Sequence, residues 1–131
     1  MNHYARIPAK NMSMLRCMLR AKLHGATITG AEIEYEGSIT IDESIIEQAG
    51  ILPFEQVMVS NLNNGERFET YVIPGKRNSG EMCLNGPTAR KGVRGDSVMV
   101  FSFGYVQEND LEGFRPKILI LDAHNKVFSV K

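Results

Sequence analysis

The chain has 131 residues, enough for one domain with a buried core, and its 15 basic and 15 acidic side chains cancel at neutral pH. Because no long run of either sign occurs, the composition argues against a nucleic-acid surface or a membrane-binding patch. No apolar stretch approaches the roughly 20 residues that span a bilayer, and the first residues lack the apolar segment of a secretory signal. We therefore expect a cytoplasmic protein with a disordered arm at 1–13 and a single domain at 14–131.

Cysteines and histidines give no sign of a disulfide or a metal site. Cys17 and Cys83 are outside any CxxC pair, and we expect both to be small buried residues of a protein from a reducing compartment. The histidines at 3, 24 and 124 are too scattered for a zinc pattern. We therefore expect no metal cofactor.

Short strand patterns recur at close spacing, as is typical of a β-barrel or a sandwich. The predicted strands are KLHGATIT at 22–29, AEIEYEG at 31–37, SITI at 38–41, QVMVSNL at 56–62, ERFETYVI at 66–73, EMCLNG at 81–86, SVMVFSFGYV at 97–106, KILILD at 117–122 and KVFSV at 126–130. Asn64–Gly65 is a strong hairpin signal between two of them. The runs at 97–106 and 117–122 are apolar nearly throughout, which predicts strands buried on both faces.

One helix interrupts this series of strands, from Glu43 to Ala49. Asp42 or Ser44 can serve as its N-cap, and Gly50 stands where a C′ residue belongs. The fold class predicted by these elements is all-β with one or two short helices. Closure into a barrel would remove the exposed strand edges.

A glycine–serine pair, Gly37–Ser38, lies in the stretch YEGSITID, where a strand begins. One interpretation is a β-bulge or a tight bend. The other is chemical, because a serine hydroxyl beside a distorted peptide bond can attack the preceding carbonyl, and glycine permits the unusual dihedrals. The resulting ester breaks by β-elimination, and hydrolysis leaves an N-terminal pyruvoyl group. This ketone forms Schiff bases with amines and needs no external cofactor such as pyridoxal phosphate.

The strand ERFETY carries the polar residues that such a ketone would need. Arg67 and Tyr71 alternate onto one face together with Glu69, and Thr70 points to the other face. An arginine can clamp a carboxylate with two hydrogen bonds, and a tyrosine can donate a proton to a basic carbanion. The alternative is an ordinary amphipathic strand with a surface ladder of arginine and glutamate.

Taken in order, the quoted motifs resemble those of the pyruvoyl-dependent aspartate 1-decarboxylases, which make β-alanine for pantothenate synthesis. The resemblance runs through MLRCMLRAKLHGATIT, YEGSITID, AGIL, NNGERFETYVIPG, CLNGPTAR and VRGDSVMVFSF, from Met14 to about Leu121. It implies a double-psi β-barrel and a homotetramer with active sites between subunits. It also implies self-cleavage between Gly37 and Ser38 into a β chain, 1–37, and an α chain, 38–131. No motif decides whether cleavage is spontaneous or needs a maturation factor.

The resemblance assigns roles residue by residue. Ser38 matches the precursor of the pyruvoyl group, Tyr71 the proton donor, Arg67 and Lys22 the cations that hold the substrate carboxylate, and Thr70 a residue that assists cleavage and contacts L-aspartate. Further matches line the site: Asn85, the substrate-contacting turn of Gly86, Pro87 and Thr88, and the edge residues His24 and Tyr35. The turn commonly reads Gly-Ala-Ala in the family, and a proline at 87 removes one backbone N–H.

A rival hypothesis is a binding module, because small double-psi barrels also occur as non-catalytic domains. The chain lacks the phosphate-binding loop of an ATPase, so it would be a free-standing binding barrel or a decarboxylase homologue that no longer matures.

Overall fold

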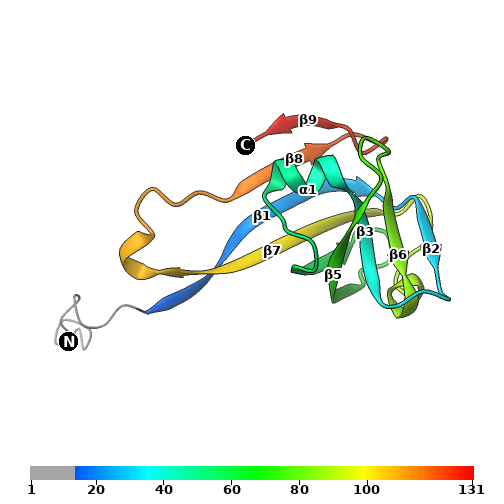
Figure 1. Cartoon of the computed structure of the whole chain (residues 1–131), viewed down its shortest axis with the longest axis horizontal. Helices are drawn as coiled ribbons and strands as arrows, with labels where there is room; N and C mark the ends of the chain where they lie inside the picture. The colour runs from blue at the N-terminus through cyan, green and yellow to red at the C-terminus, as the bar shows by residue number, and fades with distance from the viewer. Residues whose placement is uncertain (1–13) are drawn as a thin grey trace.

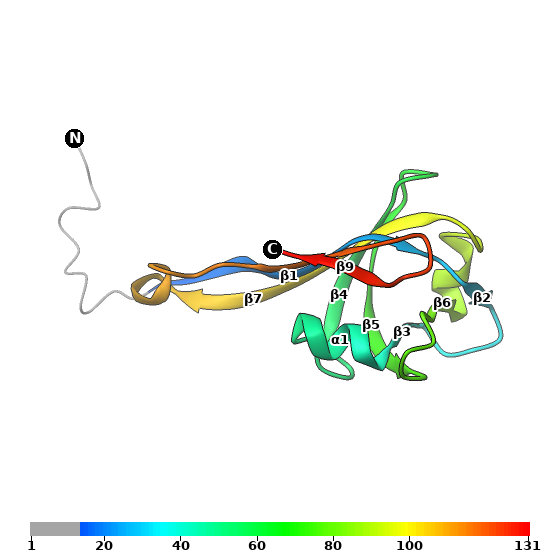
Figure 2. The same cartoon turned by 90° about the horizontal axis from the view of Figure 1, so that it is seen from above.

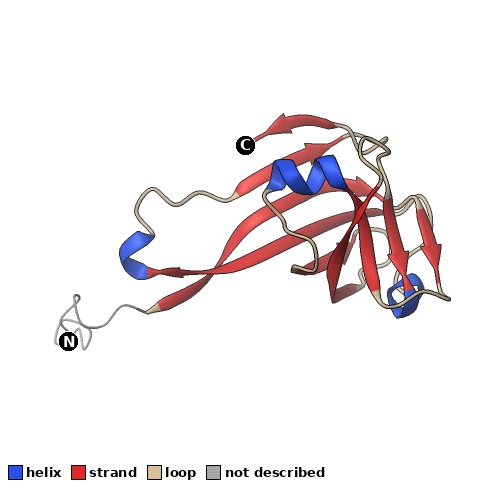
Figure 3. Ribbon diagram, viewed as in Figure 1, coloured by secondary structure: helices blue, strands red, loops and turns tan. Residues whose placement is uncertain are grey.

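The computed structural model describes residues 14–131, and the predicted arm at 1–13 lies outside them. The strands are β1 (Leu15–Thr27), β2 (Gly30–Glu32), β3 (Ser38–Asp42), β4 (Gln56–Asn61), β5 (Arg67–Gly75), β6 (Met82–Asn85), β7 (Ser97–Gln107), β8 (Lys117–Leu121) and β9 (Val127–Val130). The helices are α1 (Glu43–Ala49) and two short 3-10 helices, η3 (Gly86–Arg90) and η4 (Glu108–Asp110). Figure 3 shows that strands dominate the molecule, which confirms the all-β prediction.

The strands form one sheet in the order β2-β6-β3-β5-β4-β7-β1-β8-β9, with parallel pairs β3–β5, β1–β8 and β2–β6 among antiparallel ones. The segment between β1 and β2 ties distant parts of this sheet together. Ile28 donates its N–H to the carbonyl of Asp96 before β7, and Thr29 donates to that of Met82 in β6, both at 2.8 Å. These bonds curl the sheet into a barrel, and Figure 1 shows β2, β3, β5 and β6 gathered at one end of the long strands β1 and β7.

Helix α1 has the predicted bounds, and its N-cap is Asp42 rather than Ser44. The Asp42 carboxylate accepts a hydrogen bond from the N–H of Ser44 at 2.8 Å. Gly50 ends the helix in the left-handed conformation, with φ at 72°. No helix within residues 14–131 is long and apolar enough to cross a bilayer.

The core is built by alternation along the strands, as expected when one face of each strand points inward. Its fully buried members include Leu23, Ile39, Val59, Val72, Leu84, Val100 and Leu119. The prediction that 97–106 and 117–122 are buried on both faces is wrong, because buried and more exposed residues alternate along β7 and β8. Their outward apolar side chains include Phe101 and Phe103, which stack with ring centroids 6.2 Å apart.

The first half of β1 pairs with the second half of β7 to form a two-stranded extension of the barrel (Figures 1 and 2). We call this extension the arm from here on; it is distinct from the predicted arm at 1–13. The sequence pattern predicted a strand only from residue 22, but β1 begins at Leu15. The arm is solvated on both faces, so its residues lack the clean alternation that marks a half-buried strand. Cys17 lies on it and is exposed, which corrects the prediction of a buried thiol, whereas Cys83 is buried as predicted.

The predicted strand at 31–37 is also wrong in extent. Strand β2 ends at Glu32, and a turn follows in which Tyr35 donates its N–H to the carbonyl of Glu32 at 3.3 Å. Ile33 and Tyr35 are exposed there. Residues of this kind favour strands because they pack against neighbouring side chains of a sheet, and neither has such packing here. This turn delivers the chain to Gly37 and Ser38.

Candidate active site

Ser38 is the first residue of β3 and is completely buried. It lies opposite Asn85 of β6 in the antiparallel ladder, and the Asn85 amide donates to its hydroxyl at 2.9 Å. The Ser38 hydroxyl itself donates to the carbonyl of Glu36 at 3.4 Å. The predicted nucleophile is therefore held in place on the strand. A bulge does not describe β3, whose pairing with β6 is regular, but the chain bends at Gly37 directly before the strand, as the alternative of a tight bend predicts.

The amide of Asn85 is itself fixed by two neighbours. Its nitrogen also donates to the hydroxyl of Thr40 at 2.8 Å, and its oxygen accepts from the Cys83 thiol at 3.5 Å. Burial raises the pKa of the Cys83 thiol, with Glu81 and Glu32 adding to the effect, so the sulfur stays protonated and remains a donor. Sequence reasoning missed Thr40 and Cys83, although each lies two residues from a predicted site residue and thus shares its face.

The turn after β6 packs directly against Gly37 and the residues before it, where the sequence predicts cleavage. Gly86 has φ at +63°, and a Cβ placed there would lie 2.4 Å from the carbonyl oxygen of Tyr35 and 2.8 Å from the nitrogen of Gly37. Only glycine fits this close approach. The ring of Pro87 also borders Gly37, since its Cδ would lie 3.4 Å from a Cβ added to that glycine. Pro87 thus approaches Gly37 through its ring, and this approach needs no N–H.

Thr88 completes this buried group from the 3-10 helix η3. Its hydroxyl lies 2.7 Å from the carbonyl oxygen of Asn85 and 3.1 Å from that of Ser38, and so shares its proton between the two. We call Ser38, Thr40, Cys83, Asn85 and Thr88 the serine cluster. All of its side chains are engaged in hydrogen bonds, which is what a low-dielectric site requires.

Strand β5 runs parallel to β3 and brings Thr70 and Tyr71 to the same level as the Gly37–Ser38 peptide. The ladder pairs Ile39 with Val72. Continued by one and two residues toward the start of each strand, it sets Ser38 beside Tyr71 and Gly37 beside Thr70. Both β5 residues are half-buried, and they point to opposite faces as the sequence predicts.

The two predicted cations meet on the outer face of the sheet, away from the core. The ammonium of Lys22 lies 5.6 Å and the guanidinium carbon of Arg67 5.5 Å from the centre of the Phe101 ring. Arg67 also donates to the Ser60 hydroxyl at 3.0 Å. We call Lys22, Arg67 and Phe101 the cation cluster. Among residues 14–131, no carboxylate forms an ion pair with either cation, so both charges are available to an anion.

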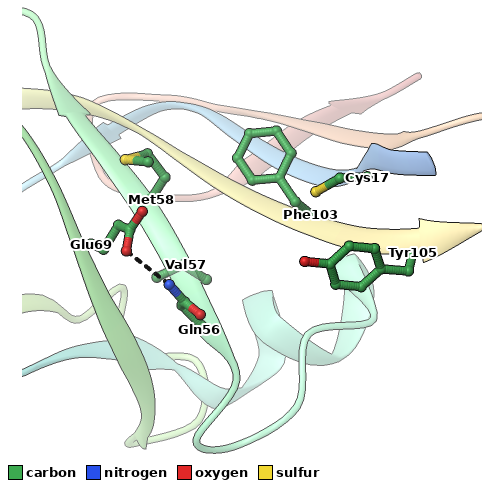
Figure 4. A pocket seen from close by; sticks show the side chains of 7 residues that line it. All are labelled: Cys17, Gln56, Val57, Met58, Glu69, Phe103 and Tyr105. Atoms are coloured by element: carbon green, nitrogen blue, oxygen red, sulfur yellow. Dashed lines mark hydrogen bonds between the residues drawn. The ribbon is translucent and has the colours of Figure 1, made fainter. Parts of the chain in front are cut away.

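The outer face continues from the cation cluster toward the arm. A pocket of about 240 Å³ lies there, lined by Phe103 and Tyr105 from β7 and by Cys17 from β1. Figure 4 shows these side chains. On its far wall Gln56 donates to Glu69 at 2.9 Å. None of the predicted site residues lines this pocket, but Glu69 is the β5 neighbour of Thr70.

Two predicted edge residues belong to neither cluster, although His24 follows Lys22 by two positions on β1. His24 pairs with Ile120 of β8 at the parallel β1–β8 ladder. The side chain of Tyr35 is 67% exposed in the turn after β2, although its carbonyl borders Gly86. Within the described part of the chain, no group of three or more His, Cys, Asp or Glu side chains is placed to hold a metal ion.

Fold and site together define a class: a small all-β barrel in which a buried serine follows a glycine packed against a tight turn, with paired cations on the outer face. The profile of the aspartate decarboxylase family matches residues 14–128. The chain therefore belongs to the aspartate decarboxylase family.

Individual relatives agree along nearly their whole length. The aspartate 1-decarboxylase of Leptospira biflexa is 46% identical over 114 residues, covering 86% of this chain and 97% of that protein. Those of Syntrophus aciditrophicus and Anoxybacillus flavithermus are 48% and 49% identical over 114 residues, each covering 87% of this chain, and 98% and 90% of the respective protein.

Proposed function

We propose that this chain cleaves itself between Gly37 and Ser38, carries a pyruvoyl group at position 38, and converts L-aspartate to β-alanine and CO2 for pantothenate synthesis. Membership of the family supports the activity. The observation that carries the cleavage is the geometry of Ser38, a fully buried hydroxyl fixed by Asn85 directly after the glycine of the cleavage peptide.

The cleavage uses only this chain's own atoms and one water. The Ser38 oxygen attacks the carbonyl carbon of Gly37, the peptide C–N bond breaks, and the nitrogen takes up the hydroxyl proton to give an ester. Loss of the Cα proton of residue 38 then expels the Gly37 carboxylate and leaves dehydroalanine. Water hydrolyses that residue to the ketone and releases ammonia. The hydrogen bond from Asn85 fixes the attacking oxygen, and the Gly86 turn fixes the backbone that it attacks.

The serine cluster suits a pyruvoyl group at position 38. Thr88 already donates to the carbonyl oxygen of residue 38 at 3.1 Å, and this oxygen stays on the residue when the hydroxyl oxygen leaves with the Gly37 carboxylate. A pyruvoyl group supplies a ketone that condenses with the amine of the substrate and accepts the electrons set free by decarboxylation. The Thr88 donor favours electron density on the adjacent carbonyl oxygen that it contacts.

The other residues bind and protonate the substrate. Lys22 and Arg67 hold its two carboxylates, and the planar fork of Arg67 fixes orientation because it can donate two parallel hydrogen bonds. Tyr71 stands at the level of residue 38 and returns a proton to the former α-carbon. Thr70 lies beside Gly37 and assists cleavage.

The site is shared between subunits of a homotetramer. Arg67 precedes Tyr71 by four positions on β5, which is about 13 Å along an extended strand. Within one chain the cation cluster is therefore too far from residue 38 to hold a substrate of aspartate's size that is joined to it. A cation cluster from a neighbouring subunit removes this difficulty. The tetramer works in the cytoplasm and needs neither a metal nor pyridoxal phosphate.

A denaturing mass spectrum combined with CO2 release from aspartate tests the proposal. The enzyme gives two fragments that meet after Gly37, and the larger lacks a free N-terminal amine. A binding barrel, or a homologue that does not mature, gives a single intact mass of 14.6 kDa and no CO2. That second result would refute the proposed catalyst.

A further inference from the structure

A strained turn lies beside Tyr71, between helix α1 and strand β4. Glu55 donates its N–H to the carbonyl of Leu52 at 3.1 Å, which closes a four-residue turn with Pro53 second and Phe54 third. Phe54 has φ at +69°. Proline in the second place and a positive φ in the third are features of a type II turn, which favours glycine or asparagine where Phe54 stands.

Phe54 is an outlier within the molecule as well. The other non-glycine residues with positive φ in residues 14–131 are Asn78 and Asn125, and asparagine tolerates this region. A bulky aromatic residue does not. Burial does not offset the strain either, because the side chain of Phe54 is 74% exposed. Strain of this kind persists where the surrounding structure enforces it, and it gathers at functional sites.

What Phe54 gains from this conformation is a contact with Tyr71. The two rings lie 6.3 Å apart, centre to centre, with their planes 32° from parallel. The backbone supports the contact from both sides of the turn. Phe54 donates its N–H to the carbonyl of Val72 at 2.7 Å, and Val72 donates to the carbonyl of Glu55 at 3.0 Å. The turn is thus bound to β5 at the residue that follows Tyr71.

The side chain of Glu55, the last residue of the turn, also anchors the turn to the barrel. The carboxylate of Glu55 accepts from the N–H of Leu52 at 3.1 Å and from the guanidinium of Arg20 at 2.5 Å. It accepts a further hydrogen bond from the buried hydroxyl of Ser102. These contacts connect the turn to β1 and β7, so Phe54 cannot swing away from Tyr71 without breaking a network of charged hydrogen bonds.

We propose that Phe54 is a positioning residue that fixes the phenol ring of Tyr71 for proton transfer. Within residues 14–131 no hydrogen bond to the Tyr71 hydroxyl is present, so ring packing is what orients it there. The inference rests on the proposed role of Tyr71 as the proton donor. It adds that the strained turn exists to hold that donor, and that asparagine at 54 would relax the backbone but lose the orientation.

Kinetics of Phe54→Asn, Phe54→Tyr and Leu52→Asn test the proposal. Phe54→Asn should lower kcat about tenfold with KM within about twofold, because misplacing a reacting group costs rate rather than affinity. Its melting temperature should not fall, since asparagine suits the positive φ. Phe54→Tyr keeps the ring and should keep kcat. Leu52→Asn removes another exposed apolar side chain from the same turn, 67% exposed, and should leave kcat unchanged.

Two further measurements separate this proposal from its premise. In the Tyr71→Phe background, Phe54→Asn should cause no additional loss of residual turnover; the same tenfold loss there would overturn the proposal. In the uncleaved Ser38→Ala chain labelled with 3-fluorotyrosine, Phe54→Asn should shift the 19F resonance of Tyr71, assigned by its absence in Tyr71→Phe, and Leu52→Asn should not. An unmoved resonance would also overturn it.

The same samples show whether Phe54 acts elsewhere. If Phe54→Asn changes the oligomeric state on a sizing column, the exposed ring is a subunit contact and the positioning role is wrong. If wild-type protein neither cleaves nor releases CO2, the proposed function fails on its own. The fluorine measurement on the uncleaved chain still decides whether Phe54 fixes the Tyr71 ring.

Discussion

The serine cluster and the cation cluster differ in how completely one chain builds them. Around Ser38 the hydroxyls, the thiol and the amide are all partnered, and the serine is fully buried. Around Phe101, two cations share one aromatic ring on the outer face and lack an ion-pair partner among residues 14–131. Phe101 is half-buried, so this face is open to whatever lies outside it.

This difference separates two tasks. Peptide cleavage needs a nucleophile and a fixed backbone, both of which lie within a single chain. In the proposed mechanism, substrate binding needs Lys22 and Arg67 close to residue 38, and for this the proposal brings in a cation cluster from a neighbouring subunit. Variants at Ser38 or at Asn85, which contacts its hydroxyl, should therefore change maturation, and variants in the cation cluster should change aspartate binding while maturation proceeds.

The largest effect is expected from Ser38→Ala, which removes the nucleophile. The chain should stay uncut, with one mass near 14.6 kDa and no decarboxylation, because no other group replaces the attacking oxygen. Ser60→Ala is the matched control, since Ser60 contacts Arg67 in the cation cluster. It should cleave like the wild type. Two fragments from Ser38→Ala would assign the chemistry to another residue.

Asn85→Ala should come next in size. It leaves the Ser38 and Thr40 hydroxyls without their common donor, which slows cleavage by at least about tenfold and lowers the free energy of unfolding by about 1–3 kcal/mol. Thr40→Val is the control, because Thr40 shares the amide of Asn85 but has no bond to Ser38. It should lose some stability and still cleave. Time courses of cleavage by mass spectrometry separate the two effects.

Cleavage at the wild-type rate in Asn85→Ala would show that the buried hydroxyl needs no orienting donor. The serine cluster would then differ from the cation cluster only in how deeply its residues are buried.

Local signals in the sequence predict single elements and not the contacts between them. They place Ser38 at the start of a strand, but its ladder partner Asn85 lies 47 positions further along the chain and was assigned only through the resemblance. The helix bounds also follow from local signals, in the cap at Asp42 and the glycine at 50. Gly86 was identified only through the resemblance, since its close approach to Tyr35 depends on tertiary packing.

Elsewhere, tertiary contacts decide the structure and local sequence patterns do not predict it. The pairing of Lys22 with Arg67 requires β1, β7, β4 and β5 to lie side by side in that order, which no local pattern encodes. The run at 97–106 looks like a buried strand because its outward residues are apolar too. Apolar residues on both faces predicted burial of both faces, but the outward residues of β7 are exposed or half-buried in a single chain.

Arg67→Lys should have a moderate effect, confined to the substrate. The charge is kept but the bidentate fork is lost, so KM for aspartate should rise about tenfold while cleavage into two fragments stays complete. Arg16→Lys is the control, because Arg16 lies exposed on the arm in an ion pair with Glu108 at 2.5 Å. Its KM should not change. Slow cleavage in Arg67→Lys would mean that the two clusters are not separate.

The smallest effect on function is expected from a substitution of Asp42, the last residue of β3, whose first residue is Ser38. Burial by itself would raise the pKa of this carboxyl, but hydrogen bonds from Gly80, Ser44 and Asn78 outweigh it, and the pKa lies below its ordinary value. A lowered folded-state pKa means that the ionised carboxylate stabilises the fold above its unfolded pKa of about 4. This contribution is lost as the pH falls through the folded-state value.

Asp42→Asn should therefore unfold at a lower temperature than the wild type at pH 6, and the gap should narrow as the pH drops below about 4. Because Asp42 caps α1 and fixes the 78–80 loop without reaching either cluster, cleavage and KM should stay at wild-type values wherever the variant is folded. A gap that is constant from pH 6 to pH 3 would show that Asp42 acts through packing rather than through its charge. A change in cleavage would show that β3 transmits strain along its length to Ser38, and the serine cluster would then extend to both ends of that strand.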